Sequence, residues 1–248
     1  MIGVGAGDPA QVTMQAVRAL NEVDVFLVPD KGAETRDLVA ARRAICDRYI
    51  ERPPYRFVEV ADPTRDRTTP GYRAAVEDWR RRRADAFERA ILDEVPEGGC
   101  GAVLAWGDPA FYDSTIAMLD DIAGRGSLAM RVEVVPGISS VQALAARHRI
   151  ALTRVGRAVQ ITTGRLLAGG LPEGVDDLVV MLDADCSFRA FDEEGLRIYW
   201  GAYLGTDDEI LVAGEVRRVA DEIVRLRARA RSRTGWIMDT YLLRRAER

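Results

Sequence analysis

The stretch that most constrains the fold is residues 102–113, AVLAWGDPAFYD, in which an apolar run stops abruptly at a turn. The first five of these residues are apolar, which predicts a short buried strand. Gly107 allows backbone conformations closed to other residues, Asp108 can accept hydrogen bonds from the N–H groups of a following helix, and Pro109 suits the first turn of that helix. In open α/β sheets ligands bind at such strand ends. The alternative is an ordinary strand–turn–helix corner without a ligand, which has the same kind of sequence pattern.

Two further turns of this kind follow predicted strands. The N-terminal stretch Gly3-Val4-Gly5-Ala6-Gly7-Asp8-Pro9 repeats the Gly-Asp-Pro tripeptide, and residues 136–140 read Pro-Gly-Ile-Ser-Ser after a predicted strand at 132–135. Each turn places flexible backbone and a polar side chain at the carboxyl end of a strand. Together the turns predict a crevice for a small molecule that has several polar groups.

The first turn differs from the common nucleotide-binding motifs. The dinucleotide fingerprint is G-x-G-x-x-G, whereas the spacing here is G-x-G-x-G-D, and no Gly-Lys-Ser/Thr follows to form a P-loop. Asp8 would repel a pyrophosphate, so the crevice better suits hydroxyls, an amine or a positive centre. Asp30 stands near the distance expected of a ribose-binding acid, which leaves a nicotinamide-dependent oxidoreductase as an alternative.

The order of predicted elements in the first half indicates an α/β domain. Predicted strands alternate with predicted helices, the strands at 23–29, 57–60, 102–106 and 132–135 and the helices at 11–21, 35–49, 72–95, 114–123 and 139–147. Such alternation predicts a largely parallel sheet with flanking helices. The run Arg80-Arg81-Arg82-Arg83 in the long helix is predicted to be a solvated face.

After about residue 153 the pattern changes. Strands are predicted at 159–163, 178–182, 198–203, 210–216 and 236–242, with helices near 188–194 and 219–231. Because helices separate the later strands less regularly, we expect a second α/β domain with a mixed sheet. The predicted domains are residues 1–154 and 155–248, with the ligand crevice between them.

The composition narrows the class of protein. With 48% hydrophobic and 30% charged residues, the chain is expected to be globular, and no apolar run approaches the ~20 residues of a membrane span. The net charge of −4 indicates no nucleic-acid partner. Cys46, Cys100 and Cys186 lie far apart without CxxC spacing, which argues against a thiol-ligated metal and for a reducing compartment. No metal is expected. Because the chain has no signal-peptide pattern at its start, it is expected to be cytoplasmic.

The three turns together resemble the N-terminal motifs of the tetrapyrrole methylases, the class III methyltransferases that use S-adenosylmethionine. Val180-Met181-Leu182 and Leu204-Gly205-Thr206 fall where the second domain of that family touches the cofactor. The resemblance covers the whole chain in order, so it is more specific than one glycine motif. It implies a homodimeric methyltransferase that uses S-adenosylmethionine, yields S-adenosylhomocysteine and acts on a polycarboxylate tetrapyrrole.

Within that family the resemblance is greatest to the branch that methylates C-1 of precorrin-5 and releases acetate during cobalamin biosynthesis. It rests on the segments VPDKG at 28–32, LVAARRAIC at 38–46, YDST at 112–115 and WIMDTY at 236–241. The alternatives are a tetrapyrrole methyltransferase acting at another ring carbon, the nicotinamide-dependent oxidoreductase, and a sensor that binds the same ligands without turnover.

The resemblance also implies roles for individual residues. The implied cofactor-binding residues are Ala6, Trp106, Gly107, Asp108, Ser139, Ser140, Met181, Gly205 and Gly235. Methyl transfer from a sulfonium needs alignment and exclusion of water more than acid–base groups, whereas release of an acyl group needs a water molecule and a base. The candidates for that second step are Asp8, Asp108, Tyr112, Asp113 and the only histidine, His148. Of these, Asp108 is favoured as an anchor for the cofactor.

One feature comes from the residues alone: residues 134–172 contain no Asp or Glu. This acid-free stretch carries Arg147, Arg149, Arg154, Arg157 and Arg165. Because arginine suits bidentate binding of carboxylates, these side chains are candidates to hold the carboxylates of the substrate. The alternative is that they are ordinary solvated arginines.

Overall fold

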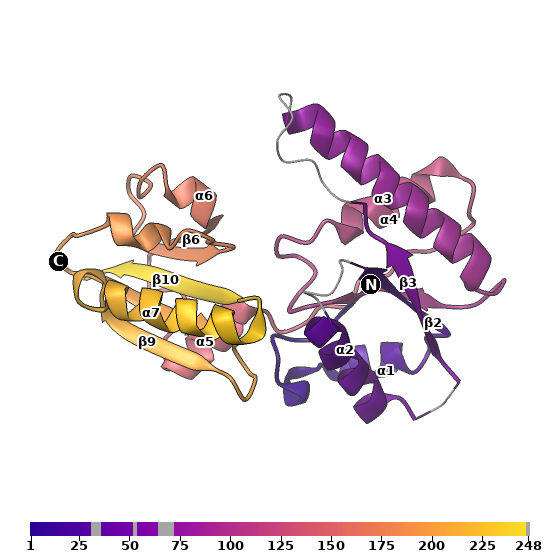
Figure 1. Ribbon diagram of the computed structural model, residues 1–248, viewed down its shortest axis with the longest axis horizontal. Coiled ribbons are helices and arrows are strands. Elements are labelled where there is room, and N and C mark those ends of the chain that lie inside the picture. Colours follow the sequence, from indigo (N-terminus) through magenta and orange to yellow (C-terminus); the bar gives the residue numbers. More distant parts are fainter. Residues whose placement is uncertain (31–35, 52–53, 64–71, 247–248) are drawn as a thin grey trace. The chain divides into compact units, whose positions relative to one another are not determined.

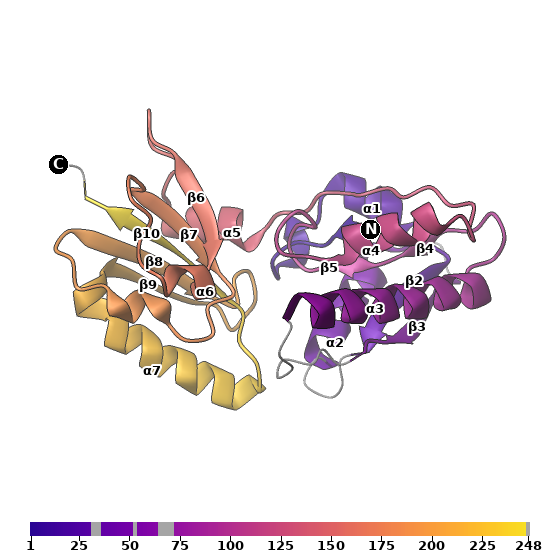
Figure 2. The ribbon, with the colours of Figure 1, turned by 90° about the horizontal axis from the view of Figure 1, so that it is seen from above.

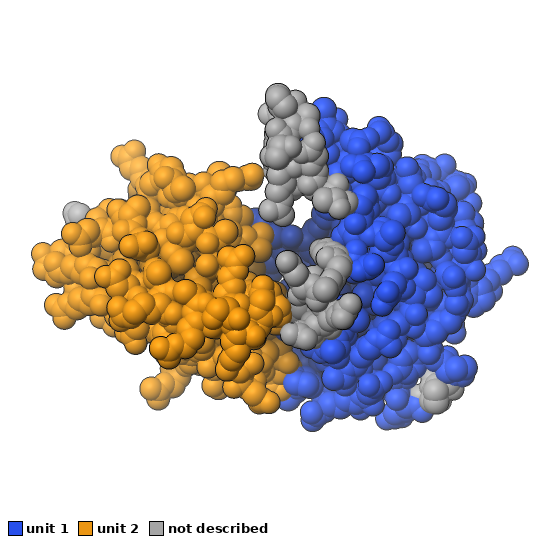
Figure 3. All heavy atoms as spheres, viewed as in Figure 1, with its two compact units in different colours: residues 1–5, 9–138 blue, residues 6–8, 139–248 orange. Residues whose placement is uncertain are grey.

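The computed structural model describes residues 1–30, 36–51, 54–63 and 72–246. The chain forms two compact units, which consist of Met1–Gly5 with Pro9–Ile138 and of Ala6–Asp8 with Ser139–Arg248 (Figure 3). The sequence predicts a domain boundary after residue 154, whereas the division into units falls after Ile138. The difference is helix α5 (Ser140–His148), which packs against the sheet of the second unit.

The strand pairs described in the first unit are all parallel. Its strands are β1 (Ile2–Gly3), β2 (Val25–Asp30), β3 (Arg56–Ala61), β4 (Gly101–Ala102) and β5 (Leu104–Ala105). β2 pairs with β3 and β4, and β5 pairs with β1. Because β4 and β5 follow each other in the chain, they connect the pairing of β2 to that of β1, so the predicted parallel arrangement is confirmed. The strand predicted at 132–135 is wrong, since only Val135 pairs, in a single bridge to Ile2.

Helices cover both faces of this parallel sheet (Figure 1). They are α1 (Met14–Leu20), α2 (Arg36–Tyr49), α3 (Tyr72–Glu94) and α4 (Thr115–Arg125), with a short 3-10 turn, η1 (Pro9–Gln11). Successive side chains of a strand point to opposite faces. Val25 and Leu27 therefore pack with α3 and α4, while Phe26 packs with α1 and α2. Within the described ranges, none of the helices has the length and apolar composition that a membrane span requires.

The second unit contains a mixed sheet, as predicted. Its order is β6 (Val159–Thr163), β7 (Asp177–Met181), β10 (Asp239–Arg245), β8 (Leu196–Ala202) and β9 (Ile210–Glu215). β6 and β7 pair in parallel, and the other pairs are antiparallel. Helix α7 (Val216–Thr234) packs along this sheet (Figure 2). The helix predicted at 188–194 is wrong, because only the 3-10 turn η3 (Ser187–Ala190) forms there, and α6 (Gly164–Leu167) was not predicted.

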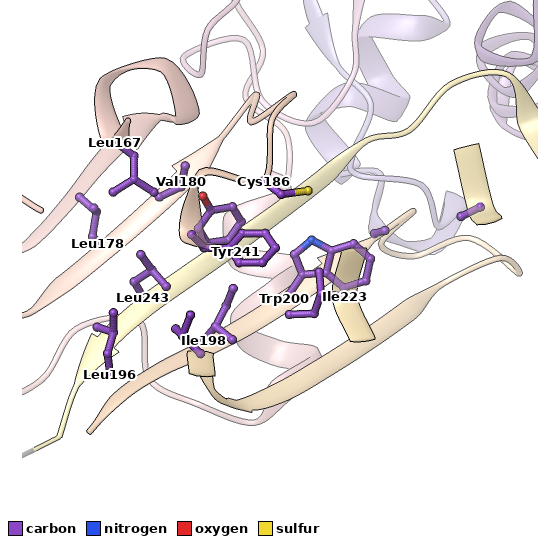
Figure 4. Close-up of a cluster of buried hydrophobic side chains, with 14 of the residues drawn as sticks. Leu167, Leu178, Val180, Cys186, Leu196, Ile198, Trp200, Ile223, Tyr241 and Leu243 are labelled. Atoms are coloured by element: carbon purple, nitrogen blue, oxygen red, sulfur yellow. The ribbon is translucent and has the colours of Figure 1, made fainter. Parts of the chain in front are cut away.

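The core between α7 and this sheet is built around two large aromatic side chains (Figure 4). Trp200 of β8 and Tyr241 of β10 are almost completely buried, and the same core includes Ile223 of α7. On the other face α5 covers the sheet, where Leu144 packs with Leu242. Large buried side chains dominate the hydrophobic stabilisation of a domain, so the sheet and its two helices are expected to fold as one cooperative body.

Candidate functional site

Backbone hydrogen bonds join the first two glycine turns within the first unit. The N–H of Gly107 donates to the carbonyl of Gly5 (2.7 Å), and the N–H of Gly5 donates to the carbonyl of Gly107 (3.2 Å). Both residues have positive φ, 85° for Gly5 and 74° for Gly107, which favours glycine at each position. The sequence predicts only that these turns line one crevice. In the structure, two hydrogen bonds join Gly5 and Gly107 directly.

Asp108 connects the second turn to the third. Its Oδ1 accepts a hydrogen bond from the N–H of Ala110 (2.8 Å), and its Oδ2 accepts one from the N–H of Gly137 (2.9 Å). Charge-assisted bonds from backbone N–H groups are among the stronger hydrogen bonds of proteins. The carboxylate therefore holds the second and third turns together through two hydrogen bonds.

Close approach of backbone segments explains the glycines at this junction. A Cβ atom on Gly137 would lie 2.2 Å from the carbonyl oxygen of Gly107, and one on Gly3 would lie 2.6 Å from the nitrogen of Gly137. Real Cβ atoms do not come so near to backbone atoms. The three turns thus form one tightly packed junction, called here the turn junction and defined by residues 3–5, 107–110 and 135–137.

The two serines of the third turn begin helix α5 in the second unit. Ser139 is its N-cap: its Oγ accepts from the N–H of Val141 (3.2 Å), while Gln142 Oε1 accepts from the N–H of Ser139 (3.0 Å). Ser140 Oγ lies 2.9 Å from Thr240 Oγ1 of β10. Both hydroxyls thus have protein partners. The backbone N–H groups and the dipole of a helix start favour a negative charge in general.

The second half of the first turn packs against the loop after β8. Ala6 is 4% exposed and contacts the apolar cluster that contains Leu204. A Cβ atom on Gly7 would lie 2.5 Å from the carbonyl oxygen of Leu204. Gly205 has φ 79°, and its N–H donates to Glu209 Oε2 (2.9 Å). The structure therefore brings together two predicted cofactor residues, Ala6 and Gly205.

The remaining predicted cofactor residues lie at element ends. Trp106 is half-buried directly after β5, and Met181 is half-buried at the carboxyl end of β7. Gly235 is the C-cap of α7, with φ 80° and its N–H donating to the carbonyl of Arg231 (2.8 Å). The end of a helix commonly requires glycine in this conformation. The described contacts of Gly235 are thus explained by its helix, and nothing in them joins it to Ala6 and Gly205.

The catalytic candidates are divided between the units. Tyr112 and Asp113 belong to the first unit and Asp8 to the second. Tyr112 is 48% exposed, and partial burial raises the pKa of its phenol, so the hydroxyl is protonated at neutral pH. Asp113 Oδ1 accepts a hydrogen bond from the N–H of Thr115 (2.6 Å). Consecutive residues of this loop therefore carry a hydroxyl donor and a carboxylate acceptor.

His148 ends helix α5. Its Nε2 lies 3.0 Å from the carbonyl oxygen of Trp200, and its ring packs edge-on against that of Tyr199. Burial lowers the pKa of the imidazole below its ordinary value. These contacts fit a neutral ring whose Nε2–H donates to the Trp200 carbonyl, and they are explained by a structural role of His148.

Three of the five arginines of the acid-free stretch form ion pairs with acids from later in the chain. Arg147 pairs with Glu209 (2.5 Å), Arg154 with Asp177 (2.9 Å) and Arg157 with Asp176 (2.5 Å). Asp177 is fully buried, so its bond to Arg154 serves the fold. Arg149, the C-cap of α5, and Arg165, in α6, are exposed.

Sequence reasoning missed Arg83. The prediction of a solvated face is right for Arg80, Arg81 and Arg82, which are exposed, and wrong for Arg83, which is 6% exposed. Its guanidinium reaches the loop that carries Tyr112 and Asp113. A signal was present, because Trp79 and Phe87 lie four residues to either side and place Arg83 on the apolar stripe of α3.

The parallel sheet with its turn junction, followed by a mixed α/β unit, defines a two-unit α/β protein of the type that binds a small polar ligand at strand ends. A model of the family Tetrapyrrole (Corrin/Porphyrin) Methylases matches residues 1–220. The chain belongs to this family, and the resemblance noted in the sequence is thereby confirmed.

Relatives and solved structures agree with this assignment. The chain is 47% identical over 244 residues to "Precorrin-6A synthase [deacetylating]" of Sinorhizobium sp, covering 98% of this chain and 94% of that protein. The crystal structure of a cobalamin synthesis related protein (CobF) from Corynebacterium diphtheriae superposes with a TM-score of 0.85 at 34% identity, covering 99% and 97% of the two chains. Uroporphyrin-III C-methyl transferase from Thermus thermophilus, solved in complex with S-adenosyl homocysteine, has the same fold (TM-score 0.58, 21% identity, 98% and 94% covered).

Proposed function

We propose that this chain is an S-adenosylmethionine-dependent C-methyltransferase of cobalamin biosynthesis that methylates C-1 of precorrin-5 and releases acetate, giving precorrin-6A. The observation that carries the proposal is the 47% identity, across nearly the whole of both chains, to a relative named for the deacetylating synthesis of precorrin-6A. We also propose that the protein is a homodimer, as the family resemblance implies, and that it is cytoplasmic. A second candidate is methylation of a related tetrapyrrole at another ring carbon, which the family alone equally supports.

The residues present suit S-adenosylmethionine. The three glycine turns contain no Lys or Arg, so they do not oppose a ligand with a positive sulfonium and an amino group. The start of α5, where Ser139 caps the helix, suits the carboxylate of the ligand. The residues that would hold it are Ala6, Trp106, Gly107, Asp108, Ser139, Ser140, Met181 and Gly205, and Gly235 stays a weaker proposal. When bound, S-adenosylmethionine supplies a methyl group on sulfur that a carbon nucleophile can displace.

The contribution of the chain to methyl transfer is alignment. An in-line displacement gains most from holding the two reacting atoms close and from excluding water, and a displacement of about 1 Å can cost ~100-fold in rate. Asp108 meets this need by fixing the second turn to the third through Ala110 and Gly137. It is therefore proposed to act as an anchor of the cofactor loops rather than as a base.

Release of acetate needs an activated water molecule. The protonated Tyr112 hydroxyl can donate a hydrogen bond to an oxygen that gains charge, and Asp113 or Asp8 can accept a proton. Asp113 already accepts one bond from Thr115, which fixes its orientation. We propose the Tyr112–Asp113 pair as the acid–base element of this step, with Asp8 as the alternative base.

Incubation with S-adenosylmethionine and precorrin-5 tests the function directly. The expected product has gained one methyl group and lost an acetyl group, with acetate released in equal amount. Methylated product without acetate would support action at another ring carbon. Binding of both ligands without loss of labelled methyl from the cofactor would indicate a sensor, and binding of a nicotinamide cofactor instead would support the oxidoreductase.

Exposed arginines of the acid-free stretch are proposed to hold substrate carboxylates. Arg165→Ala should raise KM for precorrin-5 roughly tenfold, as expected for loss of one charge-assisted contact, and leave the Kd of S-adenosylmethionine unchanged. The matched control is Arg229→Ala, which removes an exposed arginine of α7 in the same unit. Equal KM values for the two variants would show that Arg165 does not bind the substrate. Calorimetry measures the Kd of S-adenosylmethionine.

A further inference from the structure

Residues 112–115, which link the turn junction to α4 and are called here the Tyr112 loop, contact a buried arginine. Arg83 of α3 directs its guanidinium between the rings of Trp79 and Phe87, at 5.7 and 5.4 Å from their centroids. A charged group in such a place is costly unless its donors are used. The partners of this guanidinium therefore indicate what it does.

Those partners join the Tyr112 loop to the edge of the sheet. One terminal nitrogen of Arg83 donates to Ser114 Oγ (2.8 Å), the other lies 3.4 Å from Thr115 Oγ1, and Nε lies 3.5 Å from Asp62 Oδ1. Asp62 directly follows β3, and its N–H donates to the carbonyl of Asp30 at the end of β2 (3.3 Å). The planar guanidinium of Arg83 thus connects Asp62, at the carboxyl ends of β2 and β3, to the hydroxyls of Ser114 and Thr115 in the loop.

The loop is arranged around this contact. Ser114 is the N-cap of α4, and its side chain makes no capping bond to the helix; its Oγ accepts a hydrogen bond from Arg83. Asp113 instead accepts the N–H of Thr115. Tyr112 has φ 51°, a left-handed conformation that an aromatic residue rarely adopts and that persists only where the surroundings hold it.

Packing of α3 on α4 does not depend on Arg83 alone. Toward the other end of this helix pair, Arg125 of α4 pairs with Asp85 (2.7 Å) and Glu88 (2.5 Å) of α3, and Ser127 also donates to Glu88. The α3–α4 contact thus has ion pairs that do not involve Arg83, whereas Arg83 bonds Ser114 and Thr115 of the Tyr112 loop.

We propose that Arg83 is a positioning residue for the reaction, which fixes Tyr112 and Asp113 in place by holding Ser114 and Thr115 against the sheet edge at Asp62. The inference rests on the proposed function, in which Tyr112 and Asp113 act in acetate release. No chemistry is assigned to Arg83 itself. Its effect on turnover passes through the orientation of the loop.

Ser114→Ala tests the inference, with Ser127→Ala as the matched control. Both changes remove one hydroxyl that bonds α3, but only Ser114 lies in the Tyr112 loop. In Ser114→Ala we expect hydrogen exchange of residues 110–116 to rise about tenfold, kcat for acetate release to fall at least ~10-fold, and the Kd of S-adenosylmethionine to stay within about twofold. Ser127→Ala should change none of these, and Ser114→Thr, which keeps the acceptor, should restore kcat.

The outcomes are separable from those of the proposed function. Unchanged exchange in Ser114→Ala, or equal losses of kcat in Ser114→Ala and Ser127→Ala, would overturn the inference. If the wild-type protein does not turn over precorrin-5, the proposed function fails, and hydrogen exchange still decides whether Arg83 orders the loop. If Ser114→Ala does not fold, Arg83→Lys replaces it, because lysine keeps the charge opposite Asp62 but loses the fork, so the same rise in exchange is expected.

Discussion

Gly137→Ala should abolish binding of S-adenosylmethionine and destabilise the first unit by about 3 kcal/mol or more. The added Cβ would lie 2.2 Å from the carbonyl oxygen of Gly107 and 2.9 Å from the carbonyl carbon of Gly3. Both are backbone atoms, so relief requires a shift of the backbone segments that carry them. Such a shift breaks the bond between Gly137 and Asp108 and opens the turn junction. Chemical denaturation measures the stability, and calorimetry with S-adenosylmethionine measures the binding.

Gly124→Ala is the control for this change. Gly124 lies in α4 of the same unit, and a Cβ atom there would meet nothing within 4 Å. Alanine in a helix is favoured over glycine by roughly 0.5–1 kcal/mol, so this variant should be as stable as the wild type or slightly more stable and should bind the cofactor normally. If Gly137→Ala behaves like Gly124→Ala, the turn junction is not the rigid element described here.

Arg227→Met should cost about 3–5 kcal/mol of the free energy of unfolding, because it leaves a buried carboxylate without its countercharge. Arg227 of α7 is 9% exposed, and its Nε donates to Asp239 Oδ2 (3.0 Å). Another guanidinium nitrogen donates to the carbonyl of Asp183 (2.9 Å). Asp239 also accepts from the indole N–H of Trp200 (3.0 Å), and Trp200 belongs to the aromatic core of the second unit (Figure 4).

The loss in Arg227→Met should depend on pH in a defined direction. Burial already raises the pKa of Asp239 in the folded protein, and removal of Arg227 should raise it further. The folded state then binds a proton more tightly than the unfolded state, so the variant loses stability as pH rises through the folded pKa. Its deficit relative to the wild type should therefore shrink on acidification, as urea denaturation at several pH values would reveal.

Arg225→Met is the matched control on the same helix. Arg225 is exposed, and surface substitutions of this kind change stability by no more than about 0.5 kcal/mol. A cost for Arg227→Met that is no larger than the cost for Arg225→Met would show that the buried ion pair contributes little to the fold.

Predictions from sequence succeeded where neighbours in the chain carry the information. The turn at Gly107 was recognisable because it directly follows an apolar run, whereas the helix start expected at Pro109 is not found there, since α4 begins at Thr115. Alternating packing of Val25, Phe26 and Leu27 onto opposite faces likewise follows from the period of a strand. The family was recognisable from such local motifs read in order.

Predictions failed where a residue depends on contacts far along the chain. Residues 132–135 look like a strand, yet only Val135 finds a partner. Arg83 belongs to a run of four arginines, but its partners Ser114 and Thr115 lie 31 and 32 residues further along the chain, after β4 and β5. The hydrogen bond from the N–H of Gly137 to Asp108 could not be predicted for the same reason, because the two residues are 29 positions apart.

The acid-free stretch shows most clearly what the sequence determines and what only the tertiary structure decides. Its charge pattern is a property of the chain, and the arginines in it are plain to see. Whether those arginines are available to a ligand is decided by folding, which brings Asp176, Asp177 and Glu209 from outside the stretch to Arg157, Arg154 and Arg147. Local motifs determine the elements and the family because they act between neighbouring residues. Packing between distant segments determines which polar groups pair, because a buried charge needs a partner wherever the fold can supply one.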